Sequence, residues 1–265
     1  MPHRAAAAAE PCMDATNYLD RMRYRGSLDP SLETLRALHR HHMYAVPFEN
    51  LDIPARPIVL SLPSLYAKIV EGRRGGFCYE CNALFAWLLR SLDFEVTMVS
   101  ARVASQSGGF GPDFDHMALV VSARDRGGRW LADVGFGDSF VEPLDLDHPG
   151  RQDQLSGTYA VAPAPGGRET MRCRRDDGTW EDAYLFDRTP RRIEDFEAMC
   201  RHHQTSPESP FTRKRVCSLA VPGGRVTLSD DRLIVTRGSE REETVLADGE
   251  IASCLAERFG VVLPP

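Results

Sequence analysis

Apolar residues recur every three or four positions in the first third of the chain, which is the spacing of one face of an α-helix. This pattern predicts helical segments over residues 14–45, over 64–70, and from about 78 to 92. The last segment has a strong apolar face, formed by Leu84, Phe85, Leu88, Leu89 and Leu92. The Arg74-Gly75-Gly76 run breaks the chain just before it.

From Phe94 onward, apolar and polar residues alternate as they do in β-strands. The strands predicted from this alternation cover residues 94–103, 116–121, 129–134, 155–162, 169–174, 180–186, 225–228 and 233–236. Two further helices are expected over 193–202 and 250–259, the second ending at Gly260. A helical first third, a strand-rich middle and a short mixed end indicate the α+β class.

Composition narrows the class of protein. The 265 residues are 42% hydrophobic and 26% charged, as in ordinary globular proteins, and the length suggests about two domains. The net charge of −6 argues against a nucleic-acid binder, and no apolar run is long enough to span a membrane. Residues 1–13 are expected to form a loose tail, too weakly apolar for a signal peptide. Seven cysteines without a disulfide framework favour a reduced, cytoplasmic protein.

The segment Arg74 to Glu80 carries the first candidate chemistry. Two glycines allow a sharp turn, and Cys78 follows where the long helix begins. Unpaired N–H groups and the helix dipole favour an anion there, so this position is expected to lower the pKa of the Cys78 thiol. A nucleophilic cysteine would result. The alternative is a small residue that merely packs at a helix start.

A thiolate needs a base, and the base needs a group that orients it. His116 opens a predicted strand, and Asp133 lies in the next predicted strand between apolar neighbours. A buried acid needs a partner, and two strands of one hairpin would place Asp133 beside His116. The pair would then face the start of the Cys78 helix, which gives a Cys-His-Asp triad.

These motifs together resemble the arylamine N-acetyltransferases of the bacterial type, from Tyr18 to Pro264. The stretches that carry the resemblance are Pro47-Phe48-Glu49-Asn50-Leu51, Arg74-Gly75-Gly76-Phe77-Cys78, His116 with Leu119 and Val121, Asp133-Val134-Gly135-Phe136-Gly137, Thr205-Ser206-Pro207-Glu208-Ser209-Pro210-Phe211 and Gly224-Arg225-Val226-Thr227-Leu228. The resemblance implies three parts: a helical bundle over residues 1–93, a β-barrel over 94–204 and an α/β lid over 205–265. The first two parts would hold the triad as cysteine proteases do.

The resemblance also implies a ping-pong reaction. Cys78 takes an acetyl group from acetyl-CoA and passes it to an arylamine, arylhydrazine or N-hydroxyarylamine, with His116 and Asp133 completing the triad and no metal. The residues it implies for the amine pocket are Phe136, Phe48, Val103 and Phe211. Glu49 and Arg74 would form a structural buried ion pair. The partners expected are CoA and small aromatic amines, without nucleic acid or membrane, for a monomer or weak homodimer.

Other interpretations remain open at this stage. Cys78-Tyr79-Glu80-Cys81 has the Cys-x-x-Cys spacing of thiol–disulfide oxidoreductases, although no βαβ pattern precedes it. His41-His42 and His202-His203 with Cys200 would bind zinc only if the fold brought them together. A cysteine hydrolase would use the same triad, and some members of the family are amide synthases of natural-product biosynthesis.

Two positions depart from the family pattern. Position 81 is a second cysteine, and position 115, just before the histidine, is an aspartate where small or hydroxylated residues are frequent. A carboxylate there would raise the pKa of His116 or weaken CoA binding, unless it points to solvent.

Overall fold

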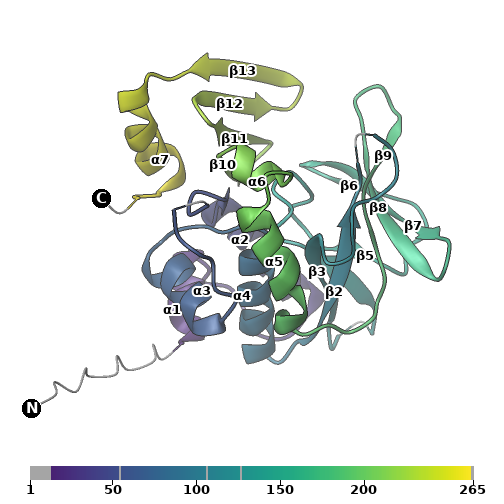
Figure 1. Cartoon of the computed structure of the whole chain (residues 1–265). Coiled ribbons are helices and arrows are strands. Elements are labelled where there is room, and N and C mark those ends of the chain that lie inside the picture. The colour runs from purple at the N-terminus through teal and green to yellow at the C-terminus, as the bar shows by residue number, and fades with distance from the viewer. Residues whose placement is uncertain (1–12, 54, 106, 126, 264–265) are drawn as a thin grey trace, which may run out of the picture.

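The computed structural model describes residues 13–53, 55–105, 107–125 and 127–263. It consists of a group of helices, an eight-stranded barrel-like sheet, and a five-stranded sheet with a C-terminal helix (Figure 1). The predicted α+β class with these three parts is therefore confirmed. The expected loose tail over residues 1–13 falls almost wholly outside the described residues. No helix within the described ranges is long and apolar enough to cross a membrane.

The helical part is made of short elements. They are α1 (Ala15–Arg21), α2 (Leu32–Ala45), α3 (Leu62–Tyr66), the π-helical turn η1 (Ala67–Glu71) and α4 (Cys78–Ser91). The helical pattern expected over 14–45 thus forms two helices. The second begins where the side chain of Ser31 accepts a hydrogen bond from the Thr34 N–H, which is an N-cap.

Helix α4 forms the centre of the molecule and lies between the other helices and the barrel-like sheet (Figure 1). The structure buries nearly all of its first three turns, the polar Glu80 and Asn82 included. A helix surrounded on all sides needs partners for such polar groups, because an unpaired buried polar atom is costly. The predicted apolar face is therefore only one part of its buried surface.

The eight-stranded sheet is antiparallel, in the order β5-β4-β3-β2-β9-β8-β7-β6. Its strands are β2 (Glu95–Val103), β3 (His116–Ser122), β4 (Arg129–Ala132), β5 (Leu144–Asp145), β6 (Arg151–Gln154), β7 (Gly157–Ala164), β8 (Arg168–Arg174) and β9 (Trp180–Phe186). The strand predicted over residues 155–162 was wrong at its start, because β7 begins only at Gly157. Leu155 is 74% exposed and lies in the turn between β6 and β7.

Two glutamine side chains connect the outer strands of this sheet. The amide of Gln152 bonds both the N–H and the carbonyl of Asp145, at 2.8 and 2.9 Å. The amide of Gln154 likewise accepts from the Glu142 N–H and donates to the Glu142 carbonyl, at 3.0 and 2.7 Å. Because each side-chain amide substitutes for a strand partner, the sheet is nearly closed into a barrel.

The C-terminal part is a second antiparallel sheet, in the order β1-β10-β11-β12-β13. Its strands are β1 (Phe48–Glu49), β10 (Val216–Val221), β11 (Gly224–Ser229), β12 (Arg232–Arg237) and β13 (Glu240–Val245). The hairpin predicted over 225–236 is β11–β12, whereas β10 and β13 were not predicted. Strand β13 is exposed along its length at the sheet edge, so it lacks an apolar alternation.

The remaining helices connect or close these sheets. They are the 3₁₀ turn η2 (Ile193–Phe196), α5 (Glu197–Thr205), α6 (Pro210–Arg213), the 3₁₀ turn η3 (Asp248–Glu250) and α7 (Ile251–Phe259). Helix α5 runs across the molecule in front of α4 (Figure 1). Helix α7 ends at Gly260 with φ +65°, as predicted.

Candidate active site

The turn before α4 packs directly on the segment that leads into β1. The Gly76 N–H donates to the Pro47 carbonyl, and the Gly76 carbonyl accepts from the Glu49 N–H, at 3.3 and 3.0 Å. A Cβ at residue 75 would lie 1.9 Å from the Pro47 carbonyl oxygen, so only glycine fits there. This close packing fixes where α4 begins and places Cys78 at its first position.

Cys78 is a buried thiol, with only 3% of the residue exposed. Burial raises the pKa of the thiol well above its usual value, and the carboxylates of Asp133 and Asp115 act in the same direction. A hydrogen bond from the Met117 backbone opposes them. The prediction that the helix start would lower this pKa is wrong for the thiol as it lies here, because burial outweighs the helix N-terminus.

His116 and Asp133 form a buried pair. The Nε2 atom of His116 lies 2.7 Å from Oδ2 of Asp133, and their side chains are 3% and 0% exposed. Burial acts to raise the pKa of Asp133, but His116, Asn82 and the Gly135 N–H together hold it below its usual value. The carboxylate is thus ionised and can only accept, so Nε2 carries the proton and Nδ1 remains available to a thiol.

Asp133 directly follows β4, not within it as predicted, and the chain bends toward α4 there. A Cβ at Gly135 would lie 2.7 Å from the Cys78 Cα, so the two backbones are in close contact. Asn82, one turn after Cys78, donates to Oδ1 of Asp133 at 2.9 Å. Asn82 was not among the residues predicted for the site, although its spacing of four residues from Cys78 places both on one helix face.

Two aromatic rings pack against His116. The ring of Phe136 meets the His116 imidazole edge to face at 5.2 Å between centroids, and Tyr184 packs against both. A second group of rings includes Phe211, whose centroid lies 6.2 Å from that of Phe48 and 5.6 Å from that of Phe77. Phe136, Phe48, Val103 and Phe211, the residues expected in the pocket, are all half-buried. Val103 is the strand partner of Tyr184.

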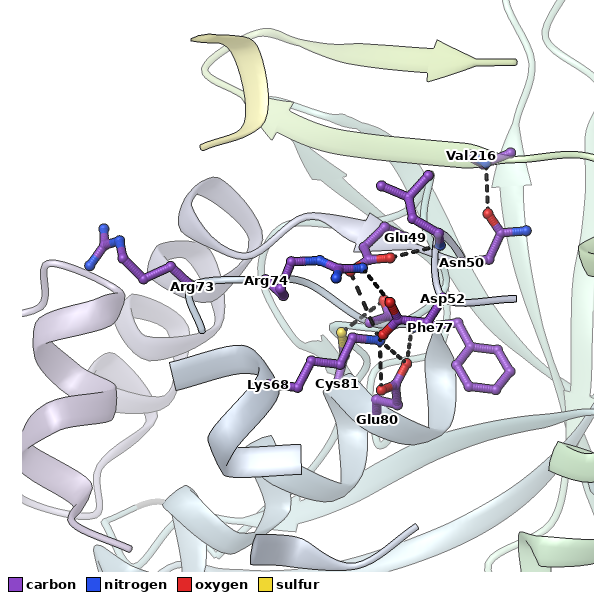
Figure 2. A network of polar contacts seen from close by, with 12 residues as sticks. Glu49, Asn50, Asp52, Lys68, Arg73, Arg74, Phe77, Glu80, Cys81 and Val216 are labelled. Carbon is purple, nitrogen blue, oxygen red and sulfur yellow. Dashed lines mark hydrogen bonds and ion pairs between the residues drawn. The ribbon is translucent and has the colours of Figure 1, made fainter. Parts of the chain in front are cut away.

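Arg74 and Glu49 belong to a larger network of buried charges behind the start of α4 (Figure 2). Arg74 Nη2 lies 2.8 Å from Glu49 Oε1 and 3.0 Å from Asp52 Oδ1. Lys68 Nζ lies 2.9 Å from Glu80 Oε1 and 3.1 Å from Asp52 Oδ2. Figure 2 shows the Lys68 ammonium between the Asp52 and Glu80 carboxylates. Lys68 is one of only two lysines in the chain, and its place in this network was not predicted from the sequence.

The network contains one more acid than base, namely Glu49, Asp52 and Glu80 against Lys68 and Arg74. Burial and the charge of Glu49 raise the pKa of Glu80 to about 7, although Lys68 opposes them. Glu80 also accepts a hydrogen bond from the Phe77 N–H at 3.2 Å, which caps α4. The protonation state of Glu80 is therefore coupled to the turn that carries Cys78.

The second cysteine of the Cys-x-x-Cys motif is not placed for thiol–disulfide exchange. Cys81 is fully buried and donates its thiol to the Gly76 carbonyl at 3.2 Å. Burial raises the pKa of this thiol, which disfavours the thiolate. The histidine pairs weighed for zinc lie on α2 and α5. Across the described ranges, no group of three or more His, Cys, Asp or Glu side chains is arranged to hold a metal ion.

A cysteine at a helix start, beside a histidine–aspartate pair on an antiparallel sheet, is the arrangement of proteins that form covalent intermediates through a thiol. A family model described as N-acetyltransferase matches residues 31–264. The pineal-gland arylamine N-acetyltransferase isozyme NAT-3 of Gallus gallus is 33% identical over 277 residues, which cover 95% of each chain. The arylamine N-acetyltransferase of Mycobacterium tuberculosis is 33% identical over 257 residues, covering 94% of this chain and 89% of the relative.

Comparison with solved structures leads to the same family. The arylamine N-acetyltransferase of M. tuberculosis has a TM-score of 0.88 at 32% identity, covering 94% of both chains. The Mycobacterium marinum enzyme in complex with CoA has a TM-score of 0.87 at 30% identity, covering 94% of this chain and 93% of that one. The chain therefore belongs to the arylamine N-acetyltransferase family, and the resemblance seen in its motifs is confirmed.

Proposed function

We propose that this enzyme transfers an acetyl group from acetyl-CoA to the nitrogen of an arylamine, arylhydrazine or N-hydroxyarylamine, through a thioester on Cys78. The observation that carries the proposal is the buried His116–Asp133 pair, 2.7 Å between Nε2 and Oδ2, beside the start of the Cys78 helix in a chain of this family. Asp133 fixes the imidazole so that Nδ1 accepts the proton of the thiol.

In the first half of the reaction, Cys78 Sγ loses its proton to His116 and attacks the thioester carbonyl. The backbone N–H of Cys78, at the first position of α4, has no partner within the helix and donates to the developing oxyanion. The bond to the CoA sulfur breaks, and His116 returns its proton to that sulfur. Because burial raises the pKa of the isolated thiol, the thiolate forms as an ion pair with His116 and not as a free anion.

In the second half, the amine nitrogen attacks the acetyl-Cys78 carbonyl and gives its proton to His116. The amide leaves, and the Cys78 thiolate regains a proton from His116. An arylamine is weakly basic and neutral at neutral pH, so its lone pair is free to attack. Phe136, Phe48, Val103 and Phe211 form the apolar walls that receive the aromatic ring, and they exclude water that would hydrolyse the thioester.

Intact-mass analysis after brief mixing with acetyl-CoA, without acceptor, tests this proposal. One acetyl group is expected on Cys78, identified by peptide mapping and removed when an arylamine is added. The variant Cys78→Ala should fold and remain unmodified. If the reduced wild-type protein forms no adduct, acetyl-CoA is not its donor. A carrier-bound acyl chain, as an amide synthase of the same family would use, is then the donor to test.

A further inference from the structure

Asp115, the unusual residue before His116, is bound by a second histidine. Nε2 of His203 on α5 lies 3.2 Å from the Asp115 carboxylate and 3.3 Å from the Asp115 carbonyl. Nδ1 of His203 lies 3.3 Å from the Ser209 hydroxyl. The side chains of His203 and Asp115 are 6% and 16% exposed, so the pair is largely shielded from water. Since both neighbours of Nε2 are acceptors, Nε2 must carry a proton.

The backbone next to this pair has an unusual conformation. Phe114 has φ +65°, in the left-handed region that non-glycine residues rarely adopt. The Tyr79 hydroxyl donates to the Phe114 carbonyl at 2.7 Å, and the Phe114 N–H donates to the Ser100 hydroxyl at 2.7 Å. The Asp115 carboxylate accepts from the Val103 N–H at 3.3 Å. Contacts from α4, β2 and α5 therefore hold the turn that leads into His116.

Three parts of the proposed site meet at His203. Its ring packs on Phe211, with 5.2 Å between centroids, and on Tyr79 at 6.1 Å. Tyr79 is the residue after Cys78, and Ser209 accepts from the Phe211 N–H. His203 thus contacts the nucleophile helix, the strand of the catalytic histidine and the segment that carries a pocket wall.

Asp115 lies close to the start of the Cys78 helix, because the hydroxyl of Tyr79, the residue after Cys78, donates to the Asp115 carbonyl at 3.1 Å. Cys200 on α5, Asp133 after β4 and Asp115 itself each raise the pKa of the Cys78 thiol in addition to the effect of burial. A carboxylate at 115 without a partner would oppose the thiolate that acyl transfer needs. The Asp115 carboxylate is instead shared by the His203 imidazole and the Val103 N–H.

Resting on the Cys78 thioester route above, we propose that His203 is a positioning residue for acyl transfer. It holds the Asp115 carboxylate against Val103 and α5, so that this charge opposes the Cys78 thiolate less than an unpartnered carboxylate would. It also fixes the turn that presents His116. The pair thus combines a carboxylate at position 115 with a compensating imidazole.

Two variants and their combination test the proposal. They are His203→Phe, which keeps an aromatic ring but removes the polar contacts with Asp115 and Ser209, Asp115→Asn, and the double variant. The first readout is the pH dependence of Cys78 alkylation by iodoacetamide, which needs no acetyl-CoA. The second is the single-turnover rate of Cys78 acetylation. His202→Phe is the matched control, because His202 is the exposed neighbour on the same helix.

His203→Phe is expected to move the alkylation profile about one pH unit upward, and so to lower the rate of acetylation at neutral pH about tenfold. The double variant should return to within about threefold of wild type, since the uncompensated charge is gone. A merely structural histidine would lower the melting temperature without this rescue. A folded His203→Phe with the wild-type profile and rate would overturn the proposal.

If His203→Phe does not fold, the alkylation profile of Asp115→Asn alone still tests whether the Asp115 charge acts on Cys78. Its alkylation profile should move downward in pH, because a negative charge near the thiol is removed; an unchanged profile would show that Asp115 does not act on Cys78. A wild-type protein that acetyl-CoA does not acetylate contradicts the proposed function, and the alkylation profiles remain a separate test of His203.

Discussion

The side-chain amide of Asn82 donates to the carboxylate of Asp133, with 2.9 Å between Nδ2 and Oδ1. The same amide donates to the Met117 carbonyl at 2.6 Å, and its oxygen accepts from the Val134 N–H at 2.9 Å. Asn82 is fully buried and lies one turn after Cys78. The helix that supplies the thiol therefore also holds the acid and the strand that carry the rest of the proposed triad.

Asp133→Asn tests the acid of this arrangement. The neutral amide cannot balance an imidazolium on His116, so kcat/KM is expected to fall at least about a hundredfold, and stability by about 1–3 kcal/mol. Because the pKa of Asp133 is lowered by folding, its stabilisation is present above the ordinary pKa of 3.8 and is lost as pH falls through the lowered value. Steady-state kinetics and urea unfolding at acid and neutral pH measure both effects.

The control is Asp176→Asn, an exposed residue in the turn between β8 and β9, which should change neither quantity. A fully active and fully stable Asp133→Asn enzyme would contradict the role proposed for this carboxylate.

Cys81→Ser separates acyl transfer from thiol–disulfide exchange. A serine hydroxyl can replace the thiol as donor to the Gly76 carbonyl, so acetyl transfer is expected to stay within about twofold of wild type. Acetylation by intact mass and reduction of an insulin disulfide are the two assays. Loss of transfer, or a disulfide reductase activity that disappears in this variant, would favour the redox interpretation.

Arg74→Met leaves the carboxylate of Glu49 buried beside Lys68 alone. Breaking one side of a buried ion pair costs about 3–5 kcal/mol in the free energy of unfolding. The double variant Arg74→Met with Glu49→Met should lose less than the sum of the two single variants. Arg25→Met provides the comparison, because Arg25 and Asp20 form an ion pair that is 71% and 53% exposed and worth at most about 1 kcal/mol. Equal losses for Arg74 and Arg25 would show that burial does not matter here.

Glu80→Gln tests the buried acid that caps the Cys78 helix. Folding raises its pKa from 4.5 to about 7, so the folded protein binds more protons than the unfolded chain between these values. The contribution of Glu80 to stability is thus fully present below pH 4.5 and is lost as pH rises through 7. The loss amounts to about 3 kcal/mol.

Unfolding by urea at several pH values from 5 to 8 should give a flatter pH dependence for Glu80→Gln than for wild type. Glu242→Gln, at an exposed position of β13, should follow the wild-type curve. Identical slopes for Glu80→Gln and wild type would show that Glu80 does not take up a proton on folding in this range.

The sequence alone indicated the fold class and the start of the central helix, and it led us to propose Cys78, His116 and Asp133 as a triad. Local rules suffice there: glycines at 75 and 76 permit the turn, apolar periodicity marks α4, and alternation marks β3 from His116 onward. The motifs, taken together in their order along the chain, then indicated the family. These signals are encoded within short segments and need no knowledge of what packs against them.

Only the tertiary structure decided what each polar group meets. Asp115 and His203 are 88 positions apart, and the local sequence around either residue gives no sign that the two meet. The raised pKa of Cys78 and the pairing of Lys68 with Glu80 follow from burial, which depends on every element around α4 at once. Charge and solvent exclusion act through space, so the pKa of a thiol that the sequence placed at a helix N-terminus is set by the whole fold.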